Sequence, residues 1–314
     1  MYHTIENEDI RVTVSDLGAT LVRFIEKKSG QDIVLGFDQE EDYLAHKGPH
    51  LGATVGRNAN RIGNARFELN GKTYQLDVND NGNQLHGGSD NFSFRRWDVE
   101  EKKEDSITFT LFSEDGDQGF PGNLRVRVTY SLEGNRLHMD YEGVADQDTL
   151  FNMTNHAYFN LGDEDILKEE LKIFTDTYSP TDEHSLTLET SLPAAGTPYD
   201  FRNFRVIGEA ISTLPCGIDN NYVFEDTAYK HMASLRNERF QLDVYSDLPD
   251  MHFYTAYYLD GFKGKDGVIY GPYKGAALEC QYYPNGINYE GYLKPVLKKG
   301  ENAKHRITYQ IAQR

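Results

Sequence analysis

The sequence has few of the features that mark secreted or membrane proteins. Its two cysteines, Cys216 and Cys280, stand far apart and in no metal-binding or CxxC spacing, so we expect reduced core thiols. No apolar run approaches the length of a transmembrane helix. Residues 1–11 lack a basic start followed by an apolar stretch, so we expect no signal peptide. Together these absences predict a cytoplasmic protein.

Basic residues are also scarce, with 32 Lys and Arg against 50 Asp and Glu and a formal net charge of -18. An acidic surface repels phosphate backbones and anionic lipid, so we expect neither nucleic acid nor a membrane surface as a partner. A neutral ligand stays compatible with this charge. The chain shows no linker-like or low-complexity tract and no clear repeat, although its 314 residues would allow two domains by length alone.

Helical periodicity is scarce as well, and most of the chain alternates apolar and polar residues in short runs, as half-buried strands do. The pair Asn70-Gly71 within 67–74 predicts a type I′ hairpin. A second hairpin is predicted to turn at 133–135. Further strands are predicted at 10–14, 107–112, 241–245, 252–259 and 276–283, with short helical turns within 164–173 and 206–214. The pattern favours an all-β fold, a large antiparallel sandwich or barrel with few short helices.

The stretch Asn152–Gly162, NMTNHAYFNLG, carries the first candidate for chemistry. It reads as a strand end running into a turn, which would hold His156 on a fixed backbone between apolar and amide neighbours. Histidine titrates nearest neutrality, so a positioned one can give or take a proton. The alternative is a core histidine that its neighbours satisfy.

Two polar stretches contain further candidates. Gly56–Ile62, GRNANRI, clusters Arg57, Asn58, Asn60 and Arg61, which together could hydrogen-bond several hydroxyls or could be an ordinary turn with surface arginines. In NQLHGG, His86 precedes two glycines that would let the backbone bend and a ligand approach closely. An ordinary loop histidine is equally compatible with that stretch.

Two carboxylates complete the set of candidates. Asp219 opens the strand-like segment Gly217–Phe224, where it could bind vicinal hydroxyls or start an Asx-turn. In 274–288, alternation places Glu279 on one face of a strand, between Ala277 and Gln281. Its neighbours on both faces are uncharged, which favours a buried carboxyl whose pKa is raised towards that of a general base. A glutamate on the wet face of a sheet is the alternative.

Taken together, these stretches resemble the aldose 1-epimerase (galactose mutarotase) family. The resemblance spans nearly the whole chain and rests on motifs that occur in the family's order, namely GRNANRI, NQLHGG, TNHAYFNL, GTPYDFR, GIDNNYVF and LECQ. It implies one large antiparallel β-sandwich domain over residues 1–314, a galactose mutarotase-like supersandwich with an open cleft. It also implies a small sugar as the substrate and no cofactor. We expect a monomer or a weak homodimer.

By motif, the resemblance maps the family's glutamate general base to Glu279, its histidine general acid to His156 and its second histidine to His86. The family's sugar-binding aspartate maps to Asp219, and its Asn-Arg pair maps to Asn60 and Arg61. These residues suit an isomerase that opens a sugar ring and recloses it on the other face, because a base must take the anomeric proton while an acid protonates the ring oxygen. The histidines show neither HxH nor HExxH spacing, so we expect no metal.

Two positions depart from the family pattern where substrate would be held. The family often has an acidic residue after the late proline, where this chain has Asn285 after Pro284. The family usually carries a sugar-contacting glutamine where this chain has His252, so sugar preference is open. Two other functions stay open at this point. A glycoside hydrolase could use Glu279 with Asp219 as its carboxylate pair, but would give the histidines no role. A catalytically silent sugar-binding sandwich would not need Glu279 and His156 together.

Overall fold

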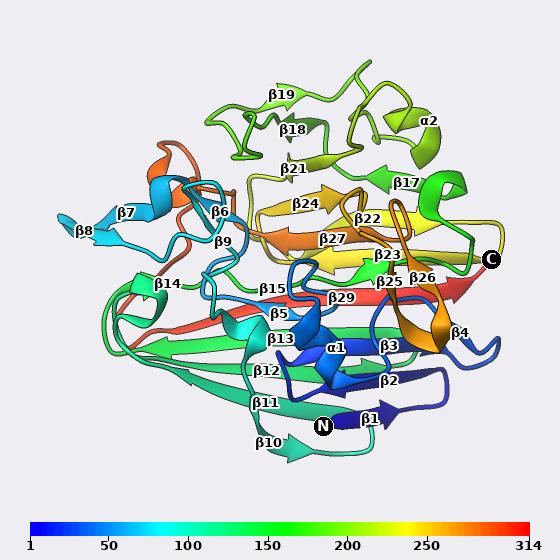
Figure 1. Cartoon of the computed structure of the whole chain (residues 1–314), viewed down its shortest axis with the longest axis horizontal. Helices are drawn as coiled ribbons and strands as arrows, with labels where there is room; N and C mark the ends of the chain where they lie inside the picture. The colour runs from blue at the N-terminus through cyan, green and yellow to red at the C-terminus, as the bar shows by residue number, and fades with distance from the viewer.

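The largest element of the computed structural model, which describes all 314 residues, is a nine-stranded antiparallel sheet (Figure 1). Its strands, in spatial order, are β10 (Asp98–Lys102), β11 (Ser106–Ser113), β12 (Leu124–Glu133), β13 (Arg136–Ala145), β29 (Asn302–Gln313), β23 (Phe240–Ser246), β22 (Lys230–Arg236), β17 (Glu170–Ile173) and β20 (Arg205–Val206). Strand β29 therefore lies in the middle of the sheet, between two strands that precede it in sequence.

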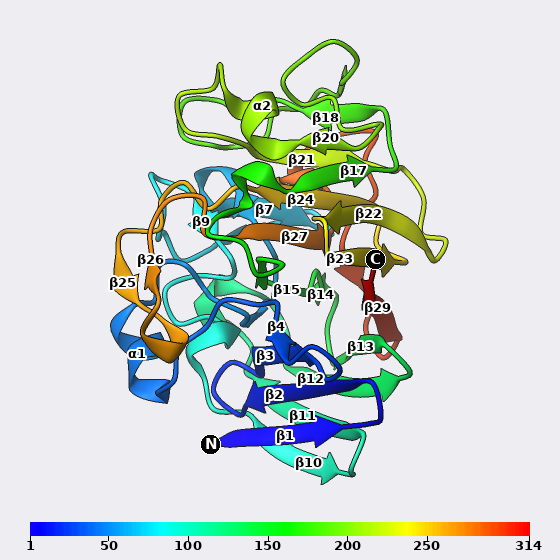
Figure 2. The same cartoon turned by 90° about the vertical axis from the view of Figure 1, so that its right-hand side faces the viewer.

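Two smaller antiparallel sheets pack against this large one (Figure 2). The six-stranded sheet contains, in spatial order, β16 (Tyr158–Phe159), β27 (Ala276–Gln281), β24 (Asp250–Tyr254), β21 (Asp219–Val223), β18 (Thr177–Ser179) and β19 (Leu192–Pro193). The four-stranded sheet contains β1 (Tyr2–Glu6), β2 (Ile10–Ser15), β3 (Thr20–Glu26) and β4 (Gln31–Asp32). The result is a β-sandwich.

Short elements border the sandwich. The paired strands are β5 (Thr54–Val55) with β15 (Thr154–Asn155), β6 (Arg61–Ile62) with β9 (Gln84–Leu85), β7 (Arg66–Leu69) with β8 (Lys72–Gln75), β14 (Thr149–Leu150) with β28 (Val296–Leu297), and β25 (Phe262–Lys263) with β26 (Ile269–Tyr270). The helices are α1 (Glu40–Ala45) and α2 (Ile207–Ile211), and the 3₁₀ turns are η1 (Gly63–Ala65), η2 (Phe92–Phe94), η3 (Asp117–Gly119), η4 (Ile166–Lys168), η5 (Lys265–Gly267) and η6 (Gly286–Asn288). No helix is both long enough and apolar enough to span a membrane.

Alternation of side chains along the strands builds the core. Val126 and Val128 of β12 point inward and share one cluster of 54 buried residues with Val12 of β2, Phe253 of β24 and Leu278 of β27. Burying one such side chain stabilises the fold by about 1.5–3 kcal/mol, so the two layers are held mainly by this shared apolar contact. The same alternation turns every second residue of β24 and β27 away from the core, which leaves one face of the six-stranded sheet for a site.

The structure confirms the all-β prediction and both predicted hairpins, since β7 and β8 turn at Asn70-Gly71 and β12 and β13 turn at 134–135. The helical turn within 206–214 is present as α2. The prediction for 164–173 is only partly right, because η4 is followed by strand β17, which completes the edge of the large sheet. The strand predicted at 252–259 ends at Tyr254.

The two thiols are both free, but only Cys280 is a core residue, and Cys216 is half-buried. The prediction of two core thiols is therefore wrong for Cys216. That residue lies in the turn before β21, where the chain runs along the surface.

Glu169, between η4 and β17, is a buried carboxyl that predicts a pH-dependent stability. It is 0% exposed, its Oε1 accepts the Leu161 N–H at 2.7 Å, and its Oε2 has no partner. Burial raises the pKa of Glu169 to about 8, with Asp163 and Asp165 adding to the effect. The folded protein therefore holds this proton more tightly than the unfolded chain does. The resulting stabilisation is complete below the ordinary pKa of 4.5 and is lost as pH rises through about 8.

Glu169→Gln should remove this dependence, because the amide keeps an acceptor for Leu161 but does not ionise. We expect the difference in unfolding free energy between the variant and the wild type to grow in the variant's favour from pH 5 to pH 8, by at most about 1.4 kcal/mol per pH unit. Urea unfolding at pH 5, 6.5 and 8 measures this difference. Parallel curves for the two proteins would contradict the assignment.

Candidate active site

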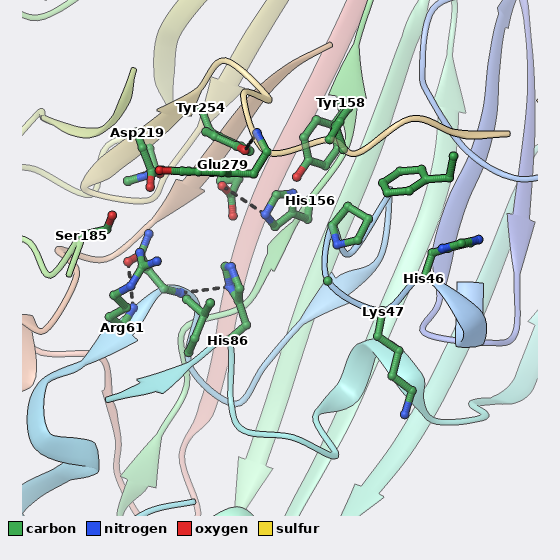
Figure 3. A pocket seen from close by; sticks show the side chains of 18 of the residues that line it. His46, Lys47, Arg61, His86, His156, Tyr158, Ser185, Asp219, Tyr254 and Glu279 are labelled. Carbon is green, nitrogen blue, oxygen red and sulfur yellow. Dashed lines mark hydrogen bonds and ion pairs between the residues drawn. The ribbon is translucent and has the colours of Figure 1, made fainter. Parts of the chain in front are cut away.

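A cleft of about 480 Å³ lies over the outward face of the six-stranded sheet. Figure 3 shows His156 and Glu279 pointing toward each other in its middle, with Arg61 and Asp219 toward one end and His46 and Lys47 toward the other. The cleft brings together all seven residues that the sequence proposed as catalytic or substrate-binding, which are Asn60, Arg61, His86, His156, Asp219, His252 and Glu279.

Strand register fixes three of these side chains on one rigid surface. His252 of β24 stands directly opposite Glu279 of β27, and Tyr254 of the same strand stands opposite Asp219 of β21. Leu278 and Cys280, on either side of Glu279 in β27, belong to the core, so Glu279 lies on the opposite face of the strand, which borders the cleft. Glu279 is only 2% exposed, and its Oε2 has no hydrogen-bond partner within the protein. An unpartnered buried carboxyl oxygen is available to a substrate hydroxyl.

His156 lies between β15 and β16, where its backbone is held from both sides. Its N–H donates to the Ala53 carbonyl and its own carbonyl accepts from the Gly52 N–H, both at 2.9 Å. The imidazole Nε2 is 3.6 Å from Glu279 Oε1, and the ring stacks on Tyr158 with centroids 5.0 Å apart. These contacts fix the imidazole beside the carboxyl, as a proton-transfer pair requires.

His86 follows β9 and is held by the backbone of Asn60. The His86 N–H donates to the Asn60 carbonyl, and the Asn60 N–H donates to His86 Nδ1, both at 3.2 Å. Because Nδ1 accepts, the neutral imidazole carries its proton on Nε2. His86 can therefore donate a hydrogen bond from Nε2 to a ligand oxygen.

The same hydrogen bond bears on metal binding. The ligand atoms of His86, His156 and Glu279 lie within 4.8 Å of one another, a set that could in principle hold a cation. A histidine that binds a metal through one nitrogen normally donates the proton on its other nitrogen to an acceptor. Here His86 Nδ1 faces a donor, the Asn60 N–H, so binding through Nε2 would set two N–H groups against each other. The donor set does not fit a resident metal.

Burial shifts the pKa values of Glu279 and His156 in opposite directions. It raises the pKa of Glu279 well above its ordinary value, with Asp219 adding to the rise and Arg61 opposing it. Burial also lowers the pKa of His156 to about 3, with a further contribution from His50. Both shifts favour the uncharged forms in the unliganded cleft, a protonated carboxyl on Glu279 and a neutral imidazole on His156. Moving the carboxyl proton to His156 needs no exchange with solvent.

Asp219 and His252 form a second pair, in which His252 Nε2 is 2.7 Å from Asp219 Oδ1. Burial would raise the pKa of Asp219, but the hydrogen bond with His252 and the positive charge of Arg61 act against it, so the pKa is lowered. His252 is 2% exposed and lines the cleft. Its position lets it orient the Asp219 carboxylate.

The polar cluster of Gly56–Ile62 divides between two roles. Asn60 and Arg61 line the cleft, and Arg61 Nε donates to Asp80 at 2.7 Å. Arg57 instead turns into the interior, where it donates to Ser113 and to the carbonyl of Gly122. The idea that the whole cluster binds hydroxyls is wrong for Arg57, because its donors are consumed by buried protein acceptors.

The glycines after His86 also serve the protein rather than a ligand. Gly87 has a φ of +92°, and a Cβ there would lie 2.1 Å from the Gly56 carbonyl oxygen. A side chain at Gly87 would therefore clash with the backbone at Gly56 and Arg57. The close approach expected at this place is between two protein segments.

Sequence reasoning missed three residues around the central pair. Tyr158 and Tyr254 line the cleft, and both lie in stretches already singled out, so adjacency to His156 and His252 could have identified them. His50 packs against the two catalytic candidates, with ring centroids 5.0 Å from His86 and 6.0 Å from His156. No spacing in the sequence signals it, because only the pairing of residues 52–53 with His156 brings it there.

The chain is similar to known proteins over nearly its whole length. A profile of the family described as Aldose 1-epimerase matches residues 1–310. The galactose mutarotase of Rattus norvegicus is 35% identical over 323 residues, covering 98% of this chain and 93% of that protein. The aldose 1-epimerase of Escherichia coli (strain K12) is 34% identical over 323 residues, covering 97% and 93%.

Solved structures show the same architecture. The GalM/aldose epimerase homologue from C. elegans superimposes with a TM-score of 0.94 at 28% identity, covering 100% of this chain and 99% of that one. The galactose 1-epimerase from Lactobacillus acidophilus superimposes with a TM-score of 0.87 at 30% identity, covering 99% and 93%.

Proposed function

The chain belongs to the aldose 1-epimerase family and is an isomerase, and from this we propose that it interconverts the α and β anomers of aldohexoses such as galactose and glucose. We assign Glu279 as the general base and His156 as the general acid, acting within one domain over residues 1–314. The observation that carries the proposal is the 3.6 Å contact between His156 Nε2 and Glu279 Oε1, inside a cleft lined by hydroxyl-binding groups.

The reaction would proceed from the protonation state in which Glu279 is a carboxylate and His156 an imidazolium. This state has the same proton count as the one that burial favours in the empty cleft. Glu279 accepts the proton of the anomeric hydroxyl while His156 donates to the ring oxygen, and the ring opens to the aldehyde. Rotation about the bond next to the carbonyl, followed by the reverse transfers, gives the other anomer. Each turnover restores both groups, so no proton needs to leave the cleft.

The remaining residues would hold the sugar. The Nε2–H of His86 can donate toward the ring oxygen, where charge develops as the ring opens. Asp219, kept ionised beside His252, can accept two hydrogen bonds from neighbouring hydroxyls. Asn60 and Arg61 border the same end of the cleft and would bind hydroxyls distant from the reacting carbon.

Polarimetry on freshly dissolved α-glucose and α-galactose tests the proposal. We expect the protein to accelerate the change of optical rotation and to release no new reducing ends from oligosaccharides. New reducing ends would instead indicate a glycoside hydrolase acting through Glu279 and Asp219. Binding of sugar without either activity would indicate a silent sugar-binding protein.

His252→Gln should change sugar preference. The imidazole of His252 has two ring nitrogens, of which Nε2 is already used by Asp219, whereas an amide offers two donors and a carbonyl. A changed hydrogen bond at one hydroxyl is worth about 1–3 kcal/mol. We therefore expect the galactose-to-glucose ratio of kcat/KM to shift roughly five-fold or more.

The measurement is initial rates by polarimetry on glucose, galactose and maltose, with the thermal unfolding of the variant recorded alongside. An unchanged ratio across the three sugars would remove His252 from substrate selection and leave it only the pairing with Asp219.

A further inference from the structure

One further histidine, His50, lies behind two of the histidines that line the cleft, His86 and His156. It belongs to the connection between α1 and β5, and that connection is tied to His156 by the backbone hydrogen bonds of Gly52 and Ala53. Its ring lies nearly parallel to that of His156, at 20°, with centroids 6.0 Å apart. It lies 5.0 Å from His86 at 57°. His50 therefore contacts the imidazoles of both His86 and His156 but does not itself line the cleft.

The orientation of the His50 ring is itself fixed. Ser93 Oγ donates to the Thr54 carbonyl at 3.1 Å, so it is free to accept from His50 Nδ1–H at 3.2 Å. Phe94 closes another side of the ring, with centroids 5.0 Å apart. Burial lowers the pKa of His50 to about 4, which keeps it neutral beside its two neighbours at pH 7.

We propose that His50 is a positioning residue. Its ring, held in place by the hydrogen bond to the Ser93 hydroxyl, fixes the orientation of the imidazoles of His156 and His86. The inference rests on the proposed function, because it assigns His50 to the geometry of the proton transfers. Without this ring, His156 would lose the surface that supports it on one side and would keep only its contacts with Tyr158 and His86. Misplacement of a reacting group by about 1 Å can cost on the order of 10²-fold in rate.

Two variants separate ring support from other roles. We expect His50→Ala to lower kcat about 10- to 100-fold while KM changes less than about three-fold, because the proton carriers shift but the hydroxyl-binding groups do not. His50→Phe keeps a planar ring and should recover most of the loss. His231→Ala is the matched control, since it removes an imidazole stacked between Phe174 and Tyr245 on the large sheet.

A second readout does not depend on activity. In the wild type, imidazole NMR signals should show His86 as the Nε2–H tautomer, and His50→Ala should shift or broaden the His86 and His156 signals. His231→Ala should leave them unchanged. If the wild type interconverted no anomers, the proposed function would fail while these spectra would still decide whether His50 orders the two rings.

Three results would overturn the proposal. The first is a kcat within about two-fold of wild type in His50→Ala together with unchanged His86 and His156 signals. The second is a rise in KM alone, which would make His50 a substrate-binding residue. The third is equal loss in His50→Phe and His50→Ala, which would mean that a planar ring at this position does not support the two imidazoles.

Discussion

Glu279→Gln is expected to lower the rate of anomer interconversion by about 10²–10⁴-fold, the contribution of a positioned proton-transfer group. The amide has the shape of the carboxyl but cannot accept the anomeric proton. The fold should persist, because burial favours the uncharged form of this side chain and an amide is no costlier to bury. Polarimetry under saturating sugar, with circular dichroism of the variant, measures both effects.

Glu169→Gln provides the matched control for this variant. It makes the same isosteric change in another buried glutamate, which lies outside the cleft, so it should leave turnover near the wild-type value. A near-normal rate in Glu279→Gln would show that Glu279 is not the base. The proton would then have to be taken by another group, and Asp219 would be the remaining carboxylate in the cleft.

His156→Asn should lower kcat by about 10²-fold or more while KM changes only a few-fold. Proton donation matters mainly in the transition state, so its loss appears in kcat rather than in ground-state binding. The variant also removes the stacking on Tyr158, but asparagine keeps the backbone hydrogen bonds to Gly52 and Ala53. Initial rates across sugar concentrations separate the two constants.

His138→Asn serves as its control, because His138 is a buried histidine of β13 that bonds Thr308 far from the cleft in the large sheet. It should lose stability without a specific loss of turnover. Unchanged kcat with a large rise in KM for His156→Asn would make His156 a sugar-binding residue and would require another acid.

Much of the fold was predictable, since alternation along a strand is a local property. The face of β27 that carries Glu279 followed from Ala277 and Gln281, and Asn70-Gly71 identified its hairpin. Strand ends were less predictable. Residues beyond Tyr254 keep an aromatic, strand-like composition, but they turn away to form the wall of the cleft.

The site was only partly predictable, because its remaining details depend on contacts between distant segments. Arg57 and Arg61 look alike in GRNANRI, yet Arg57 donates hydrogen bonds to buried backbone carbonyls and Arg61 faces the cleft. The tautomer of His86 depends on the backbone of Asn60, and the place of His50 depends on its neighbours in space. None of these contacts leaves a periodic signal in the sequence.

The position of β29 has a consequence for synthesis of the protein. The strand pairs with β13 along 302–310 and with β23 along 307–313, so neither neighbour can complete its hydrogen bonds until β29 has left the ribosome. At ~5–20 residues per second, β13 must wait on the order of ten seconds after its own synthesis. Until then the edge of β13, and that of β23 once it has been made, are open to pairing with other chains. Newly made copies should therefore depend on chaperones, and overexpression should yield more soluble protein at low temperature.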